Sequence, residues 1–171
     1  WVAVLSPAAI ERTRRVEEST DGRWVPQFLS LSAAIDNSRK DQTLNTPALA
    51  TIVMAERQVR WLLERGGMDA VSAHCAQASS LIYDWAEANL AARPFVDNPA
   101  WRSPVTATIE INEAASVSEL AAHLRARGIV DIGAYRGVGT NQLRIGTWPS
   151  VEVDDVEALL ACIDYCLERV L

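Results

Sequence analysis

Residues 133–148 read Gly-Ala-Tyr-Arg-Gly-Val-Gly-Thr-Asn-Gln-Leu-Arg-Ile-Gly-Thr-Trp and carry two arginines, Arg136 and Arg144. The alternation from Gln142 to Trp148 predicts a short strand, and the glycines before it predict a turn. A guanidinium group is planar, permanently charged and bidentate toward carboxylate or phosphate. The two arginines are therefore candidate ligands for an anion. The alternative is that both are ordinary surface arginines of a β-hairpin.

The glycine pair Gly137 and Gly139 does not form a dinucleotide-binding loop. That fingerprint, G-x-G-x-x-G, follows a strand and opens a helix whose amides face a pyrophosphate. Here Gln142 stands where the third glycine would be, and the following residues predict a strand. The glycines instead favour a tight turn with positive φ angles.

The residues around this hairpin predict an α+β layer with helices on one face of a small sheet. A serine at 116 and a glutamate at 119 form a capping-box pattern, which predicts a helix start. Apolar residues recur at helical spacing near the end of the chain. The predicted elements are strands at 105–111 and 142–148, an edge strand at 128–132, and helices at 116–128 and 153–170.

The first ninety residues predict a different organisation. An apolar strand at 1–5 precedes a helix that begins at Ser6-Pro7, and the segments 24–31 and 32–46 are predicted as extended and loop-like. Two long helices follow, each with apolar residues on one face, and Gly66-Gly67 separates them. A connector at 93–104 then leads to the C-terminal layer. The domain boundaries predicted are 1–46, 47–93 and 94–171.

Asn45-Thr46-Pro47 is a second candidate anion site. Threonine as an N-cap and proline at the first helical position predict a helix start, whose free amides and positive dipole end attract anions. Ordinary capping is the alternative.

Composition excludes several classes of function. The net charge of −6 argues against nucleic acid as a partner, and no apolar run approaches the roughly 20 residues of a membrane helix. No basic region precedes the first apolar residues, so a secretory leader is not expected. Three cysteines without ligand spacing predict reduced thiols, no metal site and a cytoplasmic location. Neither His74 nor His123 has the neighbours of a catalytic triad.

Four motifs in order resemble the C-terminal part of the phosphoserine aminotransferases of high-GC bacteria. They are a Ser-Pro helix start, Gly-Arg-Trp-Val-Pro at 22–26, Asn-x-x-Lys-Asp-Gln-Thr-Leu-Asn-Thr-Pro at 37–47, and Leu-Arg-Ile-Gly-Thr at 143–147. Those enzymes are class V members of the fold-type-I enzymes that use pyridoxal phosphate. The resemblance runs through all 171 residues and covers about half of such an enzyme. It implies that residues 94–171 are the small C-terminal domain, preceded by two long connecting helices.

The resemblance implies roles for four residues. Asn45 and Thr46 match the pair that reaches the cofactor phosphate of the neighbouring subunit in the family's homodimer. Arg144 matches the arginine that holds the substrate α-carboxylate, and Arg136 matches one that helps to hold the substrate phosphate. Two departures affect Arg136: many members have histidine where this chain has Tyr135, and the spacing between the arginines is longer here.

No catalytic residue is predicted within this chain. The lysine that forms the Schiff base belongs to a segment of the family that precedes Trp1, and Lys40 lies in the polar loop instead. Transamination needs that lysine, so the chain is not expected to catalyse alone. The complete enzyme would bind pyridoxal phosphate and transfer the amino group between phosphoserine and 2-oxoglutarate, with glutamate as the other amino acid, in serine biosynthesis.

Two other functions fit the same sequence. One is another class V aminotransferase, of the alanine–glyoxylate or serine–pyruvate type, whose small domains also carry Arg-Ile-Gly. The other is a non-catalytic dimerisation or ligand-binding module. A gene that extends upstream with a lysine-bearing cofactor domain would distinguish an enzyme from such a module.

Overall fold

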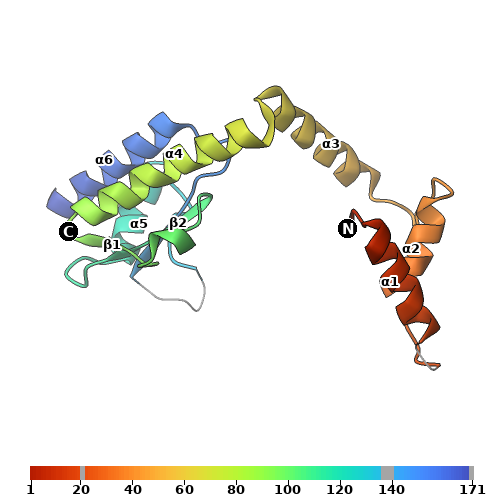
Figure 1. The fold of residues 1–171 in the computed structure, drawn as a ribbon. Coiled ribbons are helices and arrows are strands. Elements are labelled where there is room, and N and C mark those ends of the chain that lie inside the picture. Colours follow the sequence, from red (N-terminus) through yellow and green to blue (C-terminus); the bar gives the residue numbers. More distant parts are fainter. Residues whose placement is uncertain (20–21, 136–140, 170–171) are drawn as a thin grey trace. The chain divides into compact units, whose positions relative to one another are not determined.

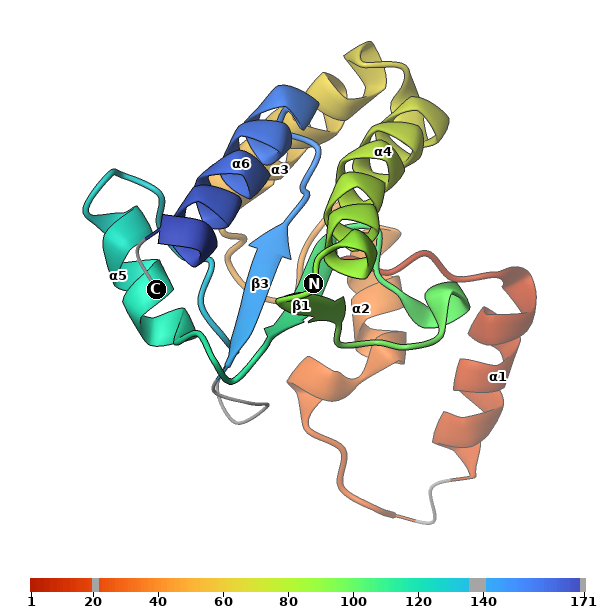
Figure 2. The same cartoon turned by 90° about the vertical axis from the view of Figure 1, so that its left-hand side faces the viewer.

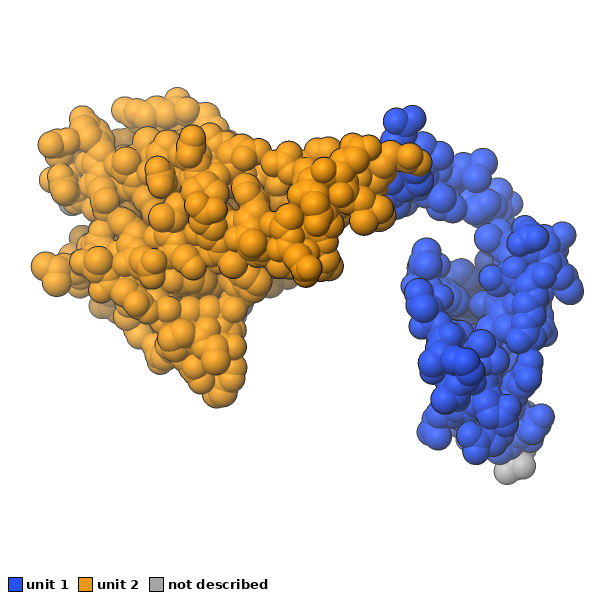
Figure 3. Space-filling view, turned by 45° about the horizontal axis from the view of Figure 1, so that its top comes forward, with its two compact units in different colours: residues 1–57 blue, residues 58–171 orange. Residues whose placement is uncertain are grey.

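The computed structural model describes residues 1–19, 22–135 and 141–169. The chain divides into two compact units, Trp1–Arg57 and Gln58–Leu171 (Figure 3). Its elements in order are α1 (Pro7–Glu18), a 3-10 turn (Gln27–Leu29), α2 (Leu31–Ser38), α3 (Leu49–Glu64), α4 (Gly67–Ala88), β1 (Ala92–Pro94), a second 3-10 turn (Pro99–Trp101), β2 (Thr106–Ile111), α5 (Val117–Arg125), β3 (Gln142–Gly146) and α6 (Val153–Arg169) (Figure 1).

The first unit contains helices without a core of their own. Ser6 caps α1 by accepting a hydrogen bond from the Ala9 amide at 3.2 Å, as its sequence predicts. Ser30 caps α2 in the same way. Neither helix contains a buried residue. Their described apolar side chains are therefore at most half-buried within this unit.

Three predictions for this unit are wrong. Residues 1–5 form no strand, because a strand needs a partner and no described residue pairs with them. The segment predicted as extended contains a 3-10 turn, and the polar segment after it contains α2. Serine and asparagine favour turns in isolation, but here Ser30 supplies the N-cap that lets a helix begin.

The helix α3 begins at Leu49, two residues beyond the predicted first position, Pro47. Thr46 is therefore not its N-cap, and the prediction of a helix start at this residue is wrong. The apolar face of α3 is mostly exposed: of its large side chains only Trp61 and Leu62 are half-buried, and none is buried. The turn that ends α3 needs glycine: Gly66 has a φ of 101°, and a side chain there would lie 2.8 Å from the Cβ of Ala70.

The second unit is built on a three-stranded antiparallel sheet in the order β1-β2-β3. Alternate residues of β2 and β3 are buried, and the residues between them are half-exposed except Gln142, which is also buried. The strands β2 and β3 match their predicted positions. The strand β1, in contrast, lies partly in a segment predicted as a connector. The edge strand predicted at 128–132 is absent; only the Ile132 carbonyl accepts a hydrogen bond from β3, at the Arg144 amide.

The helices α4, α5 and α6 cover one face of this sheet, which confirms the predicted α+β layer (Figure 2). The core joins side chains of all three helices to the buried residues of β2 and β3. Its fully buried large members are Ile82, Ile109, Leu120, Leu124, Leu143, Val156 and Ile163. Because α4 contributes Ile82, it is part of this core as well as a connection to α3.

Polar contacts fix the helix layer. The carboxylate of Asp164 on α6 accepts hydrogen bonds from Trp85 Nε1 and Asn89 Nδ2 near the end of α4, both at 2.9 Å. The hydroxyl of Tyr83 donates to the Ser103 carbonyl at 3.0 Å. Burial raises the pKa of Tyr83, against the opposing influences of Arg102 and of this hydrogen bond.

The side chain of Asn141 joins three elements just before β3. Its amide group donates to the carbonyls of Ile111 at 2.8 Å and Ala115 at 3.0 Å, and its oxygen accepts from the Val117 amide at 3.0 Å. The start of β3 is thus tied to the end of β2 and to the start of α5. The predicted cap of α5 is also present, since Ser116 accepts a hydrogen bond from the Glu119 amide.

No helix of the described residues is both long and apolar enough to cross a membrane.

Candidate functional site

The face of the sheet opposite the helices carries the polar side chains. Strand register places them in two rows across the strands. One row joins Arg93, Glu110 and Gln142, and the next places Arg144 opposite Thr108. Successive side chains of a strand point to opposite faces. Because the residues between them point into the core, these polar side chains lie on the open face.

Arg144 occupies the centre of β3 on this open face. Arg144 is half-buried, and its guanidinium carbon lies 4.8 Å from the centroid of the Tyr135 ring. This is a cation–π contact, which orients the guanidinium plane. Within residues 1–19, 22–135 and 141–169, no carboxylate forms an ion pair with Arg144. A half-buried guanidinium with unused donors is suited to bind an anion.

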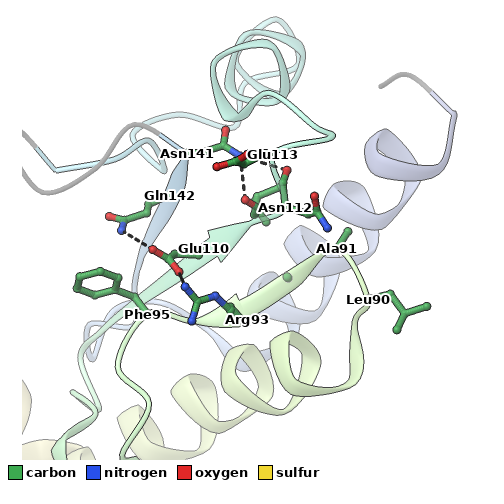
Figure 4. A pocket seen from close by; sticks show the side chains of 11 residues that line it. Leu90, Ala91, Arg93, Phe95, Glu110, Asn112, Glu113, Asn141 and Gln142 are labelled. Carbon is green, nitrogen blue, oxygen red and sulfur yellow. Dashed lines mark hydrogen bonds and ion pairs between the residues drawn. The ribbon is translucent and has the colours of Figure 1, made fainter.

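Arg93, in contrast, is paired. Its guanidinium forms an ion pair with Glu110, and the other carboxylate oxygen of Glu110 lies 3.4 Å from Gln142 Nε2 (Figure 4). The Gln142 residue is only 4% exposed, and its amide oxygen has no hydrogen-bond partner among the described residues. One row of the open face is therefore a connected polar chain across all three strands.

This row borders a shallow pocket of about 530 Å³ at the end of the sheet where β1 and β2 meet the Asn141 corner (Figure 4). Phe95 and Glu113 line the pocket beside the residues of the row. The buried oxygen of Gln142 is inaccessible to solvent, so it is not available to a ligand without rearrangement. The pocket therefore has polar walls, and the exposed carboxylate of Glu113 is one of them.

A second pocket of about 510 Å³ lies on the other side of β3, against α6. Its lining includes Ile145, Trp148 and the exposed Cys162. A side chain on Gly146 would lie 2.6 Å from Trp148 Nε1, so the exposed Trp148 side chain would have to move to accept it. This pocket is mostly apolar and contains no group suited to bind an anion among those that line it.

The other predicted ligands are placed as follows. Asn45 and Thr46 are exposed residues of the first unit, and the Asn45 carbonyl accepts a hydrogen bond from Thr43 Oγ1 at 2.6 Å. No described residue is recorded as a hydrogen-bond partner of either side chain. Arg136 lies outside the described residues. The structure therefore describes three of the four predicted ligands: Asn45 and Thr46 in the first unit and Arg144 in the second.

The remaining candidate side chains have structural contacts or are exposed. His74 Nε2 lies 2.8 Å from the Val151 carbonyl, and Lys40 is exposed in the turn after α2. Cys75 and Cys166 are buried and Cys162 is exposed, all as free thiols. The described part of the chain contains no cluster of three or more histidine, cysteine or carboxylate side chains that could hold a metal ion.

Named relatives match almost the whole chain. A putative phosphoserine aminotransferase of Mycolicibacterium vanbaalenii is 49% identical over 169 residues, which are 99% of this chain and 45% of that protein. The phosphoserine aminotransferase of Rhodococcus jostii is 46% identical over the same shares. The chain thus spans about half the length of the curated relatives it matches. No protein-family model matches the chain.

Solved structures show the same fold. A phosphoserine aminotransferase of Cytophaga hutchinsonii has a TM-score of 0.82 at 18% identity, covering 98% of this chain and 44% of that one. The enzyme of Bacillus circulans subsp. alkalophilus has a TM-score of 0.73 at 25% identity, covering 82% and 38%. An alanine–glyoxylate aminotransferase of Nostoc also reaches 0.73, at 15% identity over 96% and 42% of the two chains. Similarity of fold alone does not separate these activities.

Proposed function

We propose that this chain, which belongs by sequence to the phosphoserine aminotransferase family, is part of an enzyme that transfers an amino group between phosphoserine and 2-oxoglutarate. The identity of 45–49% to relatives with that name, over 98–99% of the chain, supports this substrate pair. The same reaction belongs to serine biosynthesis. In the domain division we propose, residues 1–46 end the large cofactor-binding domain, residues 47–93 form the linking helices, and residues 94–171 form the small domain.

The observation that carries the proposal is the state of Arg144. Its guanidinium has an aromatic ring at 4.8 Å and no carboxylate partner among the described residues. Every substrate of this transamination carries an α-carboxylate, and a guanidinium fork matches the two oxygens of that group. In the proposed enzyme Arg144 binds the α-carboxylate and orients the reacting carbon, which is a positioning role.

Asn45 and Thr46 contribute to the cofactor site in this proposal. Pyridoxal phosphate supplies the electron-accepting ring that amino-group transfer requires. An asparagine amide and a threonine hydroxyl are hydrogen-bond donors suited to its phosphate, and both residues are exposed. We propose that the pair reaches the cofactor of the neighbouring subunit in a homodimer. Arg136 would help to bind the substrate phosphate, and the enzyme would be cytoplasmic.

The experiment is steady-state kinetics of the complete enzyme that contains this chain. Replacing Arg144 with methionine removes one charge-assisted bidentate contact of about 1.5–3 kcal/mol, so KM for phosphoserine should rise roughly 10- to 150-fold. Arg65→Met is a matched control, because Arg65 forms an exposed ion pair with Glu152 in the same unit. An unchanged KM in the Arg144 variant would refute its role.

The choice between phosphorylated and plain substrates needs a second comparison. If the enzyme is a phosphoserine aminotransferase, kcat/KM for phosphoserine should exceed that for serine or alanine by several orders of magnitude. A substrate without the phosphate leaves the phosphate-binding groups of the enzyme unpaired and so loses most of its binding free energy. Equal values for serine and phosphoserine would instead favour the serine–pyruvate type of enzyme.

A further inference from the structure

Among the described residues of the three strands, Glu110 is the carboxylate on the open face. Glu110 lies on β2 two residues from Thr108, which is the register partner of Arg144. Diagonal neighbours on adjacent strands are about 7–8 Å apart, a distance that long side chains can bridge. Glu110 and Arg144 could therefore form a cross-strand ion pair, and a guanidinium in such a pair is less available to a substrate carboxylate.

The structure has Glu110 in another arrangement. Arg93 on β1 pairs with one oxygen of its carboxylate, and Gln142 on β3 approaches the other oxygen at 3.4 Å (Figure 4). Both groups lie in the row next to that of Arg144. The Glu110 side chain is 27% exposed, so water screens these contacts only in part. Its two oxygens are thus engaged while Arg144 is stacked on Tyr135 instead.

The next carboxylate close to Arg144 along the chain is also engaged. Asp131 precedes Ile132, whose carbonyl accepts the hydrogen bond of the Arg144 amide at 2.8 Å. The carboxylate of Asp131 forms an ion pair with Arg125 on α5 at 3.1 Å. Each of these two acidic groups is therefore paired with an arginine, although Arg93 also lies 3.9 Å from the exposed carboxylate of Asp97.

We propose that Arg93 and Gln142 are positioning residues that hold Glu110 away from Arg144 and so keep the Arg144 guanidinium open to an anionic substrate. The inference rests on the proposed role of Arg144 and extends it. Arg93 never touches the substrate in this proposal; it acts through Glu110. Removing Arg93 releases a carboxylate that competes with the substrate for the same guanidinium, and removing the charge of Glu110 abolishes that competition.

The test is a set of four variants of the complete enzyme at low ionic strength. Arg93→Met should raise KM for the amino-acid substrate about two- to fivefold, the range of a partly exposed ion pair, with kcat little changed. Glu110→Gln alone should leave KM close to that of the parent. The double variant should also return to the parent value, because no competing charge remains. Arg65→Met, which removes one positive charge elsewhere in the unit, should have no effect.

Two kinetic outcomes overturn the proposal: an unchanged KM in Arg93→Met, or a double variant that keeps the defect of Arg93→Met. The second would mean that Arg93 acts on folding or on the substrate directly. Added salt should shrink the Arg93→Met effect, because it screens the released carboxylate.

A second readout separates this proposal from the proposed function. In the 171-residue chain, the Nε–Hε signal of Arg144 is followed by nuclear magnetic resonance and assigned from its loss in Arg144→Met. A new Glu110 contact should shift the signal in Arg93→Met, and the double variant should restore it. If Arg144→Met leaves KM unchanged, the proposed role of Arg144 in substrate binding is refuted. The Arg144 signal still tests whether Arg93 holds Glu110 away from Arg144. An unshifted signal would overturn the inference whatever the kinetics show.

Discussion

The hydrogen bonds of Asp164 should be the polar contacts that contribute most to the packing of α4 against α6. Its Oδ1 atom accepts two hydrogen bonds at 2.9 Å, from Trp85 Nε1 and from Asn89 Nδ2. A hydrogen bond to a charged group contributes about 1.5–3 kcal/mol when it is buried. Because Asp164 is half-exposed and water can replace part of each contact, we take roughly 1–1.5 kcal/mol for each bond. Asp164→Ala should therefore lower the free energy of unfolding by about 2–3 kcal/mol.

The assay is urea unfolding of the chain followed by circular dichroism and by tryptophan fluorescence. The midpoint should fall at an unchanged slope, since the variant changes stability and not the surface exposed on unfolding. Asp164→Asn keeps an acceptor oxygen without the charge, so it should lose about half as much. Glu168→Ala, on an exposed position of the same helix, should stay within about 0.5 kcal/mol of the parent. If Asp164→Ala is as stable as Glu168→Ala, the two hydrogen bonds do not stabilise the helix pair and the reasoning is refuted.

Two further predictions concern the same unit. The raised pKa of Tyr83 means that the folded chain retains this proton at pH values where the unfolded chain has lost it, so stability should fall as the pH rises above 10.0, the ordinary tyrosine value. Tyr83→Phe should flatten that alkaline decline in urea midpoints measured from pH 8 to 11, and an equally steep decline would contradict it. Gly66→Ala should destabilise the chain by about 1–3 kcal/mol, because φ is 101° and the new Cβ would meet Ala70; a thermal midpoint equal to that of the parent would show that the turn can rearrange.

The sequence was informative where local pattern and tertiary structure agree. The alternation of β2 and β3 and the serine cap of α5 have local causes, and both predictions are confirmed. The motifs also predicted the resemblance to phosphoserine aminotransferases, which relatives of 45–49% identity confirm. Arg144 was predicted on a strand, and it lies there on the open face of the sheet.

Other features depend on pairing that a sequence does not display. The strand β1 has only three residues, one of them Pro94, and it exists because it pairs with β2. Residues 1–5 have strand-like composition, yet no described residue pairs with them. The contact between Arg93 and Glu110 was missed for the same reason: their side chains meet only through the register of two strands, and a shift of one residue would place them on opposite faces. The alternation of the strand indicated that Glu110 lies on the polar face, but it did not indicate which residue pairs with Glu110.

Asn141 has an evolutionary consequence for the arginine pair. Its side chain forms hydrogen bonds with the backbone of Ile111, Ala115 and Val117 and so fixes the start of β3. The register that places Arg144 opposite Thr108 is therefore fixed by residues from Asn141 onward. Loops tolerate insertions and deletions where their ends are fixed. Under the roles proposed for the two arginines, a change in the number of residues between Arg136 and Asn141 would alter the phosphate side of the site, while Asn141 keeps the position of Arg144 and thus the carboxylate side unchanged.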